Sequence, residues 1–287
     1  LYVVATPFGN LSDISPRALE TLKNCALIAA EDTRVTRALL NHFGIDTPCV
    51  SNHQHNEENR AAPIIERMLA ENIDVAVVTG TPCISDPGSV LVHEAAQAGI
   101  EVLAVPGATA MASALSVSGF DTREFAFYGF LPRQKKDLEE KLLSIAHSGV
   151  PIAVAHESPH RVIDLVRVIA ATLPGCRISA SCDLTKLYEK TIRGTADEVL
   201  AMLLANEKAE KGEYCLVLDL HDVHLAEQQA APNASLEARI FELMFSGKDM
   251  REAGDVLMAQ GEKRNDVYRA RTAVQRFLES LYEDDEE

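Results

Sequence analysis

The sequence predicts an α/β protein with a mostly parallel N-terminal sheet, a second α/β module and a helical C-terminal module. In the N-terminal part, short apolar runs alternate about five times with helix-like segments, which is the pattern of parallel sheets. The second module begins near residue 125, and around residues 191–194 its spacing suits a hairpin strand better than a crossover connection. The C-terminal part has only helical periodicity.

The first module begins with an apolar strand over residues 1–5, which turns sharply at T-P-F-G-N. A helix to about Lys23 follows, with Asp13 or Ser15 as its cap and Pro16 in its first turn. The other expected strands and helices alternate along the chain: strands at 25–30, 49–51, 75–78 and 102–105, and helices at 35–43, 59–70, 89–97 and 110–118.

Polar residues follow these strands where parallel strands present their carboxyl ends. They include Asn10, the E-D-T-R segment at 31–34, and His53 and His55. Residues 77–88, V-V-T-G-T-P-C-I-S-D-P-G, form a strand end, a glycine-proline loop and a helix start. Such a loop can surround a ligand with backbone N–H groups, although alone it equally fits a turn that binds nothing.

The second module is expected to alternate strands and helices with one short antiparallel strand. A basic loop at 131–136 holds Arg133, Lys135 and Lys136. H-E-S-P-H-R at 156–161 and D-L-T-K-L-Y-E at 183–189 each follow a strand. The expected strands are 124–130, 151–155, 178–182, 191–194 and 214–220, and the expected helices are 137–146, one ending near 173, and 195–204.

The remaining chain is expected to be a polar linker and three helices, 236–245, 249–258 and 265–281. The last two, joined by a turn at Gly261, have the outline of a helix-turn-helix, although a helical dimerisation or docking cap fits equally well. We therefore expect domains at 1–122 and 123–222, a linker at 223–234, a helical domain at 235–282 and a disordered acidic tail at 283–287.

Composition excludes several classes of protein. The net charge of −16 argues against electrostatic binding of nucleic acid over a broad surface, so any contact with nucleic acid needs local basic patches. No apolar run approaches the length of a membrane span, and no signal peptide is recognisable. The six cysteines include no C-x-x-C pair, which indicates reduced thiols in a cytoplasmic protein. Two histidines without a third ligand argue against a metal site. Neither G-x-G-x-x-G nor a phosphate-binding P-loop occurs.

Nine segments carry a resemblance to one family, in its order: V-A-T-P-F-G-N-L-S-D-I, A-A-E-D-T-R, H-Q-H-N-E, G-T-P-C-I-S-D-P-G, V-P-G-A-T-A, Y-G-F-L-P-R, H-E-S-P-H-R, D-L-T-K-L-Y-E and K-G-E-Y-C-L-V-L. The chain resembles the tetrapyrrole methylase superfamily over about residues 1–220, and within it the branch that methylates a cytidine 2′-oxygen in the decoding centre of small-subunit ribosomal RNA. The resemblance implies a two-domain class III methyltransferase fold, a homodimer, and S-adenosylmethionine bound between the domains.

The resemblance also implies the cofactor contacts, many of them through backbone groups. From the first domain they are Phe8, Gly80, Thr81, Pro82, Cys83, Ile84, Ser85, Pro106, Gly107, Thr109 and Ala110. From the second domain they are Glu157, Leu184 and Thr185. One departure stands out, because the family pattern V-S-D-A-G-T-P is shortened here to V-T-G-T-P at residues 78–82, without the acidic and the small residue. Ala5 also stands where the family pattern has proline.

A ribose hydroxyl is a poor nucleophile, so methyl transfer gains from a base or a cation that lowers its pKa. We expect Asp32, Arg34, Lys186 and Glu189 to supply this role, with Asn10 and His53 positioning the nucleotide. Arg37, Arg133, Lys135, Lys136 and the helical module would hold RNA phosphates. Two alternatives remain: a tetrapyrrole-type carbon methyltransferase of the same fold, and a non-catalytic nucleic-acid-binding protein.

Overall fold

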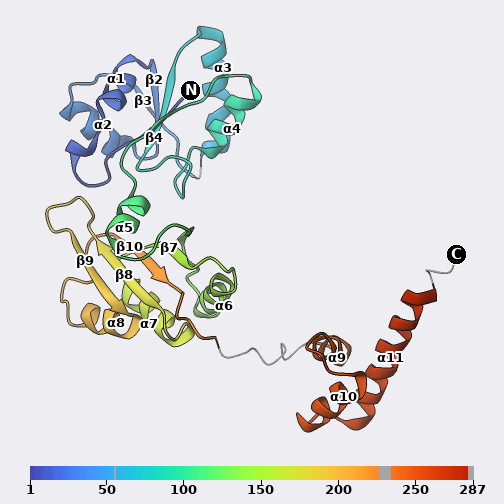
Figure 1. The fold of residues 1–287 in the computed structure, drawn as a ribbon. Coiled ribbons are helices and arrows are strands. Elements are labelled where there is room, and N and C mark those ends of the chain that lie inside the picture. Colours follow the sequence, from blue (N-terminus) through green and yellow to red (C-terminus); the bar gives the residue numbers. More distant parts are fainter. Residues whose placement is uncertain (55, 226–233, 284–287) are drawn as a thin grey trace. The chain divides into compact units, whose positions relative to one another are not determined.

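The computed structural model describes residues 1–54, 56–225 and 234–283, and it divides into two compact units, 1–224 and 225–287 (Figure 1). Each unit is described by itself. Residues 226–233 of the expected linker and residues 284–287 of the expected acidic tail lie outside the described residues. His55 also lies outside them.

The first sheet has five strands in the order β3-β2-β4-β1-β5, and all of its described pairings are parallel. This confirms the expected parallel architecture. The strands are β1 (Tyr2–Ala5), β2 (Leu27–Ala30), β3 (Cys49–Ser51), β4 (Val75–Thr79) and β5 (Leu103–Val105). The helices are α1 (Pro16–Asn24), α2 (Thr33–His42), α3 (Glu57–Glu71) and α4 (Ser89–Gln97).

Alternating side chains of the central strands pack into two hydrophobic clusters, one on each face of the sheet. Val75 and Val77 of β4 pack with Ile64 and Met68 of α3, and Leu91 of α4 joins the same cluster. The intervening strand residues pack in a second cluster with α1 and α2. Because both faces are covered, β4 is apolar along nearly its whole length, which is why it lacks the alternation of a half-exposed strand.

The second sheet has the order β6-β7-β10-β8-β9. Strands β6 and β7 pair in parallel and the other pairs are antiparallel, which confirms the expected antiparallel strand near 191–194. The strands are β6 (Ala126–Phe130), β7 (Ile152–Glu157), β8 (Arg177–Cys182), β9 (Lys190–Thr195) and β10 (Tyr214–Asp219). The helices are α5 (Ala110–Ser118), α6 (Lys135–Ala146), α7 (Val162–Thr172) and α8 (Ala196–Leu204).

Helix α5 covers one face of this second sheet, where Ala114 and Leu115 pack against Val154 and Val217 (Figure 1). Arg193 of β9 fixes the helix end, because its Nε donates to the carbonyl oxygens of Val117 at 3.1 Å and Ser118 at 3.0 Å. A cation at a helix C-terminus satisfies carbonyls that lack partners within the helix. Helix α5 is thereby anchored to the second sheet.

The C-terminal unit has three helices, α9 (Leu236–Phe245), α10 (Met250–Ala259) and α11 (Arg264–Glu283), as the sequence predicts. Its core includes Ile240, Leu257 and Val274, one from each helix. Asp249 caps α10 in a reciprocal capping box with Glu252. In the described part of the chain no helix is long and apolar enough to cross a membrane.

Candidate active site between two strained loops

The glycine-proline loop after β4 is tied back onto its own strand. Asp86 Oδ2 accepts a hydrogen bond from the Thr81 backbone N–H at 2.9 Å and also lies 2.9 Å from the Thr79 hydroxyl. The same hydroxyl lies 2.7 Å from Glu31 Oε2 at the end of β2. The loop is therefore held at the carboxyl edge of the parallel sheet.

Backbone strain is concentrated in this loop. Cys83 and Ser85 have left-handed backbones, with φ of 67° and 61°. Non-glycine residues reach this region at a cost and persist there only when neighbouring structure holds them. Glu57 helps to stabilise this loop, because its buried Oε2 accepts a hydrogen bond from the Gly88 N–H at 2.9 Å just before α4 begins.

The loop also touches the second sheet. Gly129 of β6 has φ of 61°, and a Cβ there would collide with the Ser85 hydroxyl and lie 3.5 Å from Ser85 Cβ. Glycine at this position thus permits the close approach of two segments that come from different sheets. The loop at the carboxyl edge of the first sheet and strand β6 of the second sheet are therefore in direct contact.

A second contact joins the first turn of the chain to the loop at 183–189. The Asn10 N–H donates to Thr185 Oγ1 at 3.1 Å. A Cβ on Gly9 would meet the Leu184 carbonyl oxygen at 2.8 Å and Lys186 Cγ at 2.9 Å. Asp183 and Thr185 have left-handed backbones, with φ of 52° and 65°. The loops at 80–88 and 183–189, two of the segments that the resemblance assigns to the cofactor, are therefore strained.

The third predicted segment lies beside the end of β1. A Cβ on Gly107 would lie 2.8 Å from the Ala5 carbonyl oxygen, so only glycine allows this approach. Thr109 is the N-cap residue of α5, where its side chain makes no capping bond, and Ala110 is the first helical residue. Phe8 packs with Met111 and Leu184 in the cluster beneath α5.

Strand register decides which side chain of the H-E-S-P-H-R segment faces these loops. His156 pairs with Cys215, whose side chain belongs to the α5 cluster, so His156 lies on the face that carries Phe8 and Leu184. Glu157 pairs with Tyr214 and lies on the opposite face. There its Oε1 accepts from the Ser158 N–H at 2.7 Å and lies 3.4 Å from Arg161 Nη1.

His156 has the features of a ligand-binding residue. Its Nε2 is buried without a hydrogen-bond partner in the described residues, and its ring contacts Phe127 and Phe130 edge-on. Burial lowers the pKa of this imidazole, while the carboxylate of Asp86 opposes the shift. A neutral imidazole beside apolar rings and rigid backbone loops suits a ligand that carries a heteroaromatic ring and polar groups.

The candidate catalytic residues form two separate groups. Asp32 caps α2 and pairs with Arg34, with 2.9 Å between Asp32 Oδ2 and Arg34 Nη2. The side-chain hydrogen bond from Arg34 lowers the pKa of Asp32 to about 2. Lys186 Nζ pairs with Asp183 at 2.8 Å and Glu213 at 2.9 Å. No hydrogen bond or ion pair joins the two groups in the described part of the chain.

The other candidates occupy turns beside these groups. Glu189 Oε2 accepts the Thr185 N–H at 2.6 Å and thereby closes the strained turn. Asn10 caps a short helical turn, because its side chain accepts the Ser12 N–H at 3.0 Å. The His53 backbone N–H donates to Asn56 Oδ1 at 2.8 Å where the chain enters α3.

Three of the four candidate RNA-binding residues already have partners within the protein. Arg37 donates to the Thr47 carbonyl oxygen at 3.2 Å. Lys135 and Lys136 lie 3.7 and 3.8 Å from the carboxylates one turn further along α6. Arg133 is exposed in the preceding loop. Exposed pairs of this kind are weak and can exchange for phosphate contacts.

Within the described ranges, no group of three or more His, Cys, Asp or Glu side chains could hold a metal ion.

A family model described as tetrapyrrole (corrin/porphyrin) methylases matches residues 1–200. The chain belongs to this family. It is 37% identical to the Escherichia coli O157:H7 protein named ribosomal RNA small subunit methyltransferase I, over 94% of this chain and 93% of that protein. The protein of the same name from Halalkalibacterium halodurans is 44% identical, over 76% of this chain and 75% of that protein.

Solved structures show the same fold. A diphthine synthase matches with a TM-score of 0.60 at 13% identity, over 78% of this chain and 92% of that one. The methyltransferase CobJ matches with a TM-score of 0.56 at 18% identity, over 78% and 95% of the two chains. These matches confirm the class of fold that the sequence predicts for this tetrapyrrole methylase.

Three residues at the site of this methylase were absent from the sequence-based selection. Glu57 and Asp86 lie inside recognised motifs, so their position was a usable signal. Their carboxylates accept hydrogen bonds from the backbone N–H groups of Gly88 and Thr81, contacts that the motifs alone do not reveal. His156 was passed over in favour of its neighbour Glu157, because only the pairing of β7 with β10 distinguishes the two faces.

Proposed function

We propose that this tetrapyrrole methylase transfers the methyl group of S-adenosylmethionine to the 2′-oxygen of a cytidine ribose in the decoding centre of small-subunit ribosomal RNA. The observation that carries the proposal is the relatives named ribosomal RNA small subunit methyltransferase I, which align over nearly the whole chain. The meeting of motif loops from two sheets supports a site for cofactor and substrate.

The cofactor supplies an electrophilic methyl group on a sulfonium, and the chain must align the ribose oxygen with it. Alignment can supply much of the rate of such an in-line displacement. The fixed backbones of the loops after β4 and β8 provide that rigidity, with Gly80–Ser85, Pro106–Ala110, Phe8, Leu184 and Thr185 as the proposed cofactor contacts. His156 joins them in preference to Glu157, because it lies on the face toward these loops.

Lys186 is proposed as the cation that stabilises charge on the attacking oxygen. Burial lowers the pKa of Lys186, but the hydrogen bonds that its ammonium donates to Asp183 and Glu213 outweigh that effect and leave the pKa raised. Lys186 is therefore an ammonium at neutral pH and acts as an electrostatic stabiliser, not as a base. Asp32 and Arg34 form an exposed ion pair that, with Asn10 and His53, positions the nucleotide. Glu189 is proposed as the carboxylate that accepts the proton lost by the 2′-hydroxyl when the oxygen is methylated.

Single-turnover methylation of small ribosomal subunits tests these roles. Lys186→Ala is expected to slow methyl transfer by about a hundredfold while calorimetry gives an unchanged affinity for S-adenosylmethionine. Lys186→Arg retains the charge and is expected to keep part of the rate. If Lys186→Ala and Asp32→Ala both methylate subunits at the wild-type rate, the assignment is wrong.

RNA binding is proposed to use local positive charge in a chain whose net charge is −16. Arg37, Arg133, Lys135 and Lys136 would hold phosphates, together with the helical C-terminal module, and the affinity would then fall steeply with salt. Filter binding of small-subunit RNA at several salt concentrations measures that slope. A flat response excludes the phosphate contacts.

A homodimer in the cytoplasm is proposed from the family resemblance, with the domain boundaries 1–122, 123–222 and 235–282. Light scattering of the full chain distinguishes a dimer from a monomer. A tetrapyrrole-type substrate remains a second candidate only at the level of the shared fold. Incubation with labelled cofactor and either small ribosomal subunits or porphyrinoids separates the two functions, and a failure to bind S-adenosylmethionine would favour a non-catalytic RNA-binding protein.

A further inference from the structure

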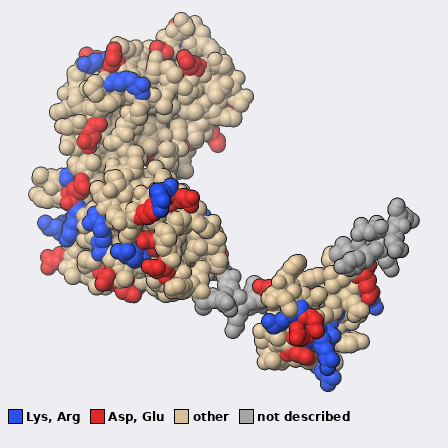
Figure 2. Space-filling model, in the orientation of Figure 1, with Lys and Arg blue, Asp and Glu red and all other residues tan. Residues whose placement is uncertain are grey.

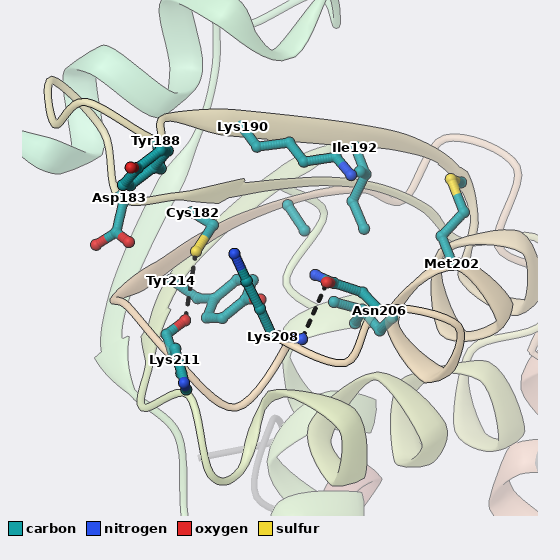
Figure 3. A pocket seen from close by; sticks show the side chains of 12 residues that line it. Cys182, Asp183, Tyr188, Lys190, Ile192, Met202, Asn206, Lys208, Lys211 and Tyr214 are labelled. Carbon is teal, nitrogen blue, oxygen red and sulfur yellow. Dashed lines mark hydrogen bonds between the residues drawn. The ribbon is translucent and has the colours of Figure 1, made fainter.

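One hollow in the described part of the second α/β domain lies on the sheet face away from α5. It encloses about 390 Å³ between β8, β9, the N-terminal end of β10 and helix α8 (Figure 3). Its twelve lining residues are Ala180, Cys182, Asp183, Tyr188, Lys190, Ile192, Met202, Leu203, Asn206, Lys208, Lys211 and Tyr214. Apart from Asp183, none of them belongs to the active-site groups described above.

Positive charge exceeds negative charge among these lining residues. Three lysines face one carboxylate, Asp183, and that carboxylate already pairs with Lys186. No carboxylate lies within ion-pairing distance of Lys190, Lys208 or Lys211 in the described structure. Figure 3 shows Lys190 and Lys208 extending across the hollow from different elements, and Figure 2 shows Lys and Arg side chains gathered over β8 and β9. An anion would meet unneutralised ammonium groups here.

Apolar and aromatic surface lies beside these lysines. Tyr188 is 81% exposed although its ring is large, and the neighbouring Leu187 is 87% exposed. Met202 and Ile192 contribute further apolar surface to the hollow. Exposed aromatic and apolar side chains next to positive charge suit a ligand with a flat ring and a negative group. Asn206 adds an amide at the rim, where its Oδ1 accepts the Lys208 N–H at 3.1 Å.

One short loop separates the hollow from the proposed active site. Residues 183–189 line the hollow with Asp183 and Tyr188, while Thr185 in the same loop bonds to Asn10 and Leu184 packs under α5. A polymer bound on one side of this loop can therefore reach the other side. A nucleotide next to the methylated one has a flat base and a phosphate, and the RNA backbone links it to the methylated nucleotide on the other side of this loop.

We propose that this hollow binds an unstacked nucleotide of the RNA substrate that flanks the methylated residue. Its base stacks on Tyr188, and Lys190 and Lys208 hold its phosphate. This inference rests on the proposed function, and it specifies single-stranded RNA as the substrate class, because a stacked and paired base cannot enter a side-chain pocket.

Steady-state methylation of small ribosomal subunits tests the base contact. Tyr188→Ala is expected to raise KM between about five- and a hundredfold, with kcat nearly unchanged, because stacking on one aromatic ring contributes to binding at this scale. Tyr188→Phe retains the ring and is expected to keep the wild-type KM. Calorimetric affinity for S-adenosylmethionine is expected to stay unchanged in both variants, which shows that the fold and the cofactor site are intact.

Salt-dependent RNA binding tests the phosphate contact. Lys190→Ala and Lys208→Ala are each expected to lower the slope of log affinity against log salt by about one for a short single-stranded RNA, and annealing the RNA to its complement is expected to weaken binding. Lys23→Ala, an exposed lysine at the end of α1, is the matched control and should leave the slope unchanged.

The two hypotheses fail in different ways. If wild-type protein does not methylate small subunits, the proposed function is wrong whatever the variants do. If wild-type protein methylates them and Tyr188→Ala and Lys208→Ala show wild-type KM and salt slope, the nucleotide site is wrong. If Tyr188→Ala instead converts a dimer to a monomer by light scattering, the exposed surface is an interface with a second copy, and the inference is overturned.

Discussion

Substitution of Gly9 by alanine tests whether the first turn and the 183–189 loop must touch. A Cβ at this position would lie 2.8 Å from the Leu184 carbonyl oxygen and 2.9 Å from Lys186 Cγ, and it would also collide with the Thr185 hydroxyl. The carbonyl is backbone and cannot rotate away, so the two segments must separate. Overpacking of this kind typically costs about 1–3 kcal/mol.

The expected loss of stability can be measured directly. For a unit of this size, about 1–3 kcal/mol corresponds to a fall in Tm of roughly 2–12 °C, which scanning calorimetry resolves. The same separation lengthens the 3.1 Å bond from Asn10 to Thr185, so methyl transfer is expected to slow about a hundredfold even well below Tm.

Gly80→Ala is the matched control. A Cβ there would meet only Asp86 Oδ2, at an ordinary 3.5 Å, and the Gly80 backbone is not left-handed. Its Tm is expected to stay the same or rise slightly, because alanine restricts the unfolded chain. The double variant Gly9→Ala with Thr185→Ala should recover only part of the stability, since the Leu184 carbonyl remains in place. A wild-type Tm and rate for Gly9→Ala would refute the contact.

Three further predictions concern other parts of the fold. Arg193→Ala should destabilise the second domain by about 1 kcal/mol in urea unfolding, because it removes the hydrogen bonds to Val117 and Ser118 at the end of α5; Arg193→Lys, without the guanidinium geometry, should restore little of it. Burial lowers the pKa of His156, so the unfolded state binds the proton more tightly and stability should fall as pH drops below about 6.5. Between about pH 7.5 and about pH 5.5, which bracket the ordinary imidazole pKa of about 6.5, the Tm of His156→Gln should fall less than the Tm of the wild type. Cys215 is buried and burial raises its pKa to about 12, so a thiol reagent should modify this residue only after unfolding. Burial also raises the pKa of Cys182, but this thiol is only half-buried, so the reagent should reach it in the native state.

Much of the fold could be predicted because its segments follow local rules. Helices α4 and α5 have the predicted bounds, since a glycine-rich turn or a proline precedes each of them and small or apolar residues continue each one. Helix α6 was predicted to begin at Asp137 but begins at Lys135. Two lysines in a first turn oppose the helix dipole, so the sequence rule placed the start at the first acid. In the structure, Glu139 and Glu140 lie one turn further on and offset that charge.

The sequence identifies the loops of the candidate site, whereas the placement of its side chains depends on strand pairing. The motifs identify the segments 80–88 and 183–189, and the parallel topology brings the first of these to the sheet edge. The choice between His156 and Glu157 depends on the register of β7 with β10, two strands far apart in sequence. A shift of one residue in that register would exchange the two faces. Local sequence contains no information on that pairing.

The shortened start of the loop after β4 can be understood from the same contacts. Strand β4 runs to Thr79 and passes directly to Gly80, where the family pattern has an acidic and a small residue between strand and glycine. Asp86 returns from the far end of the loop to the Thr79 hydroxyl and the Thr81 N–H. Glu31 approaches the same hydroxyl, which has a single proton and can donate to one carboxylate at a time. The loop therefore keeps carboxylate oxygens at its base without the acid that the resemblance leads us to expect.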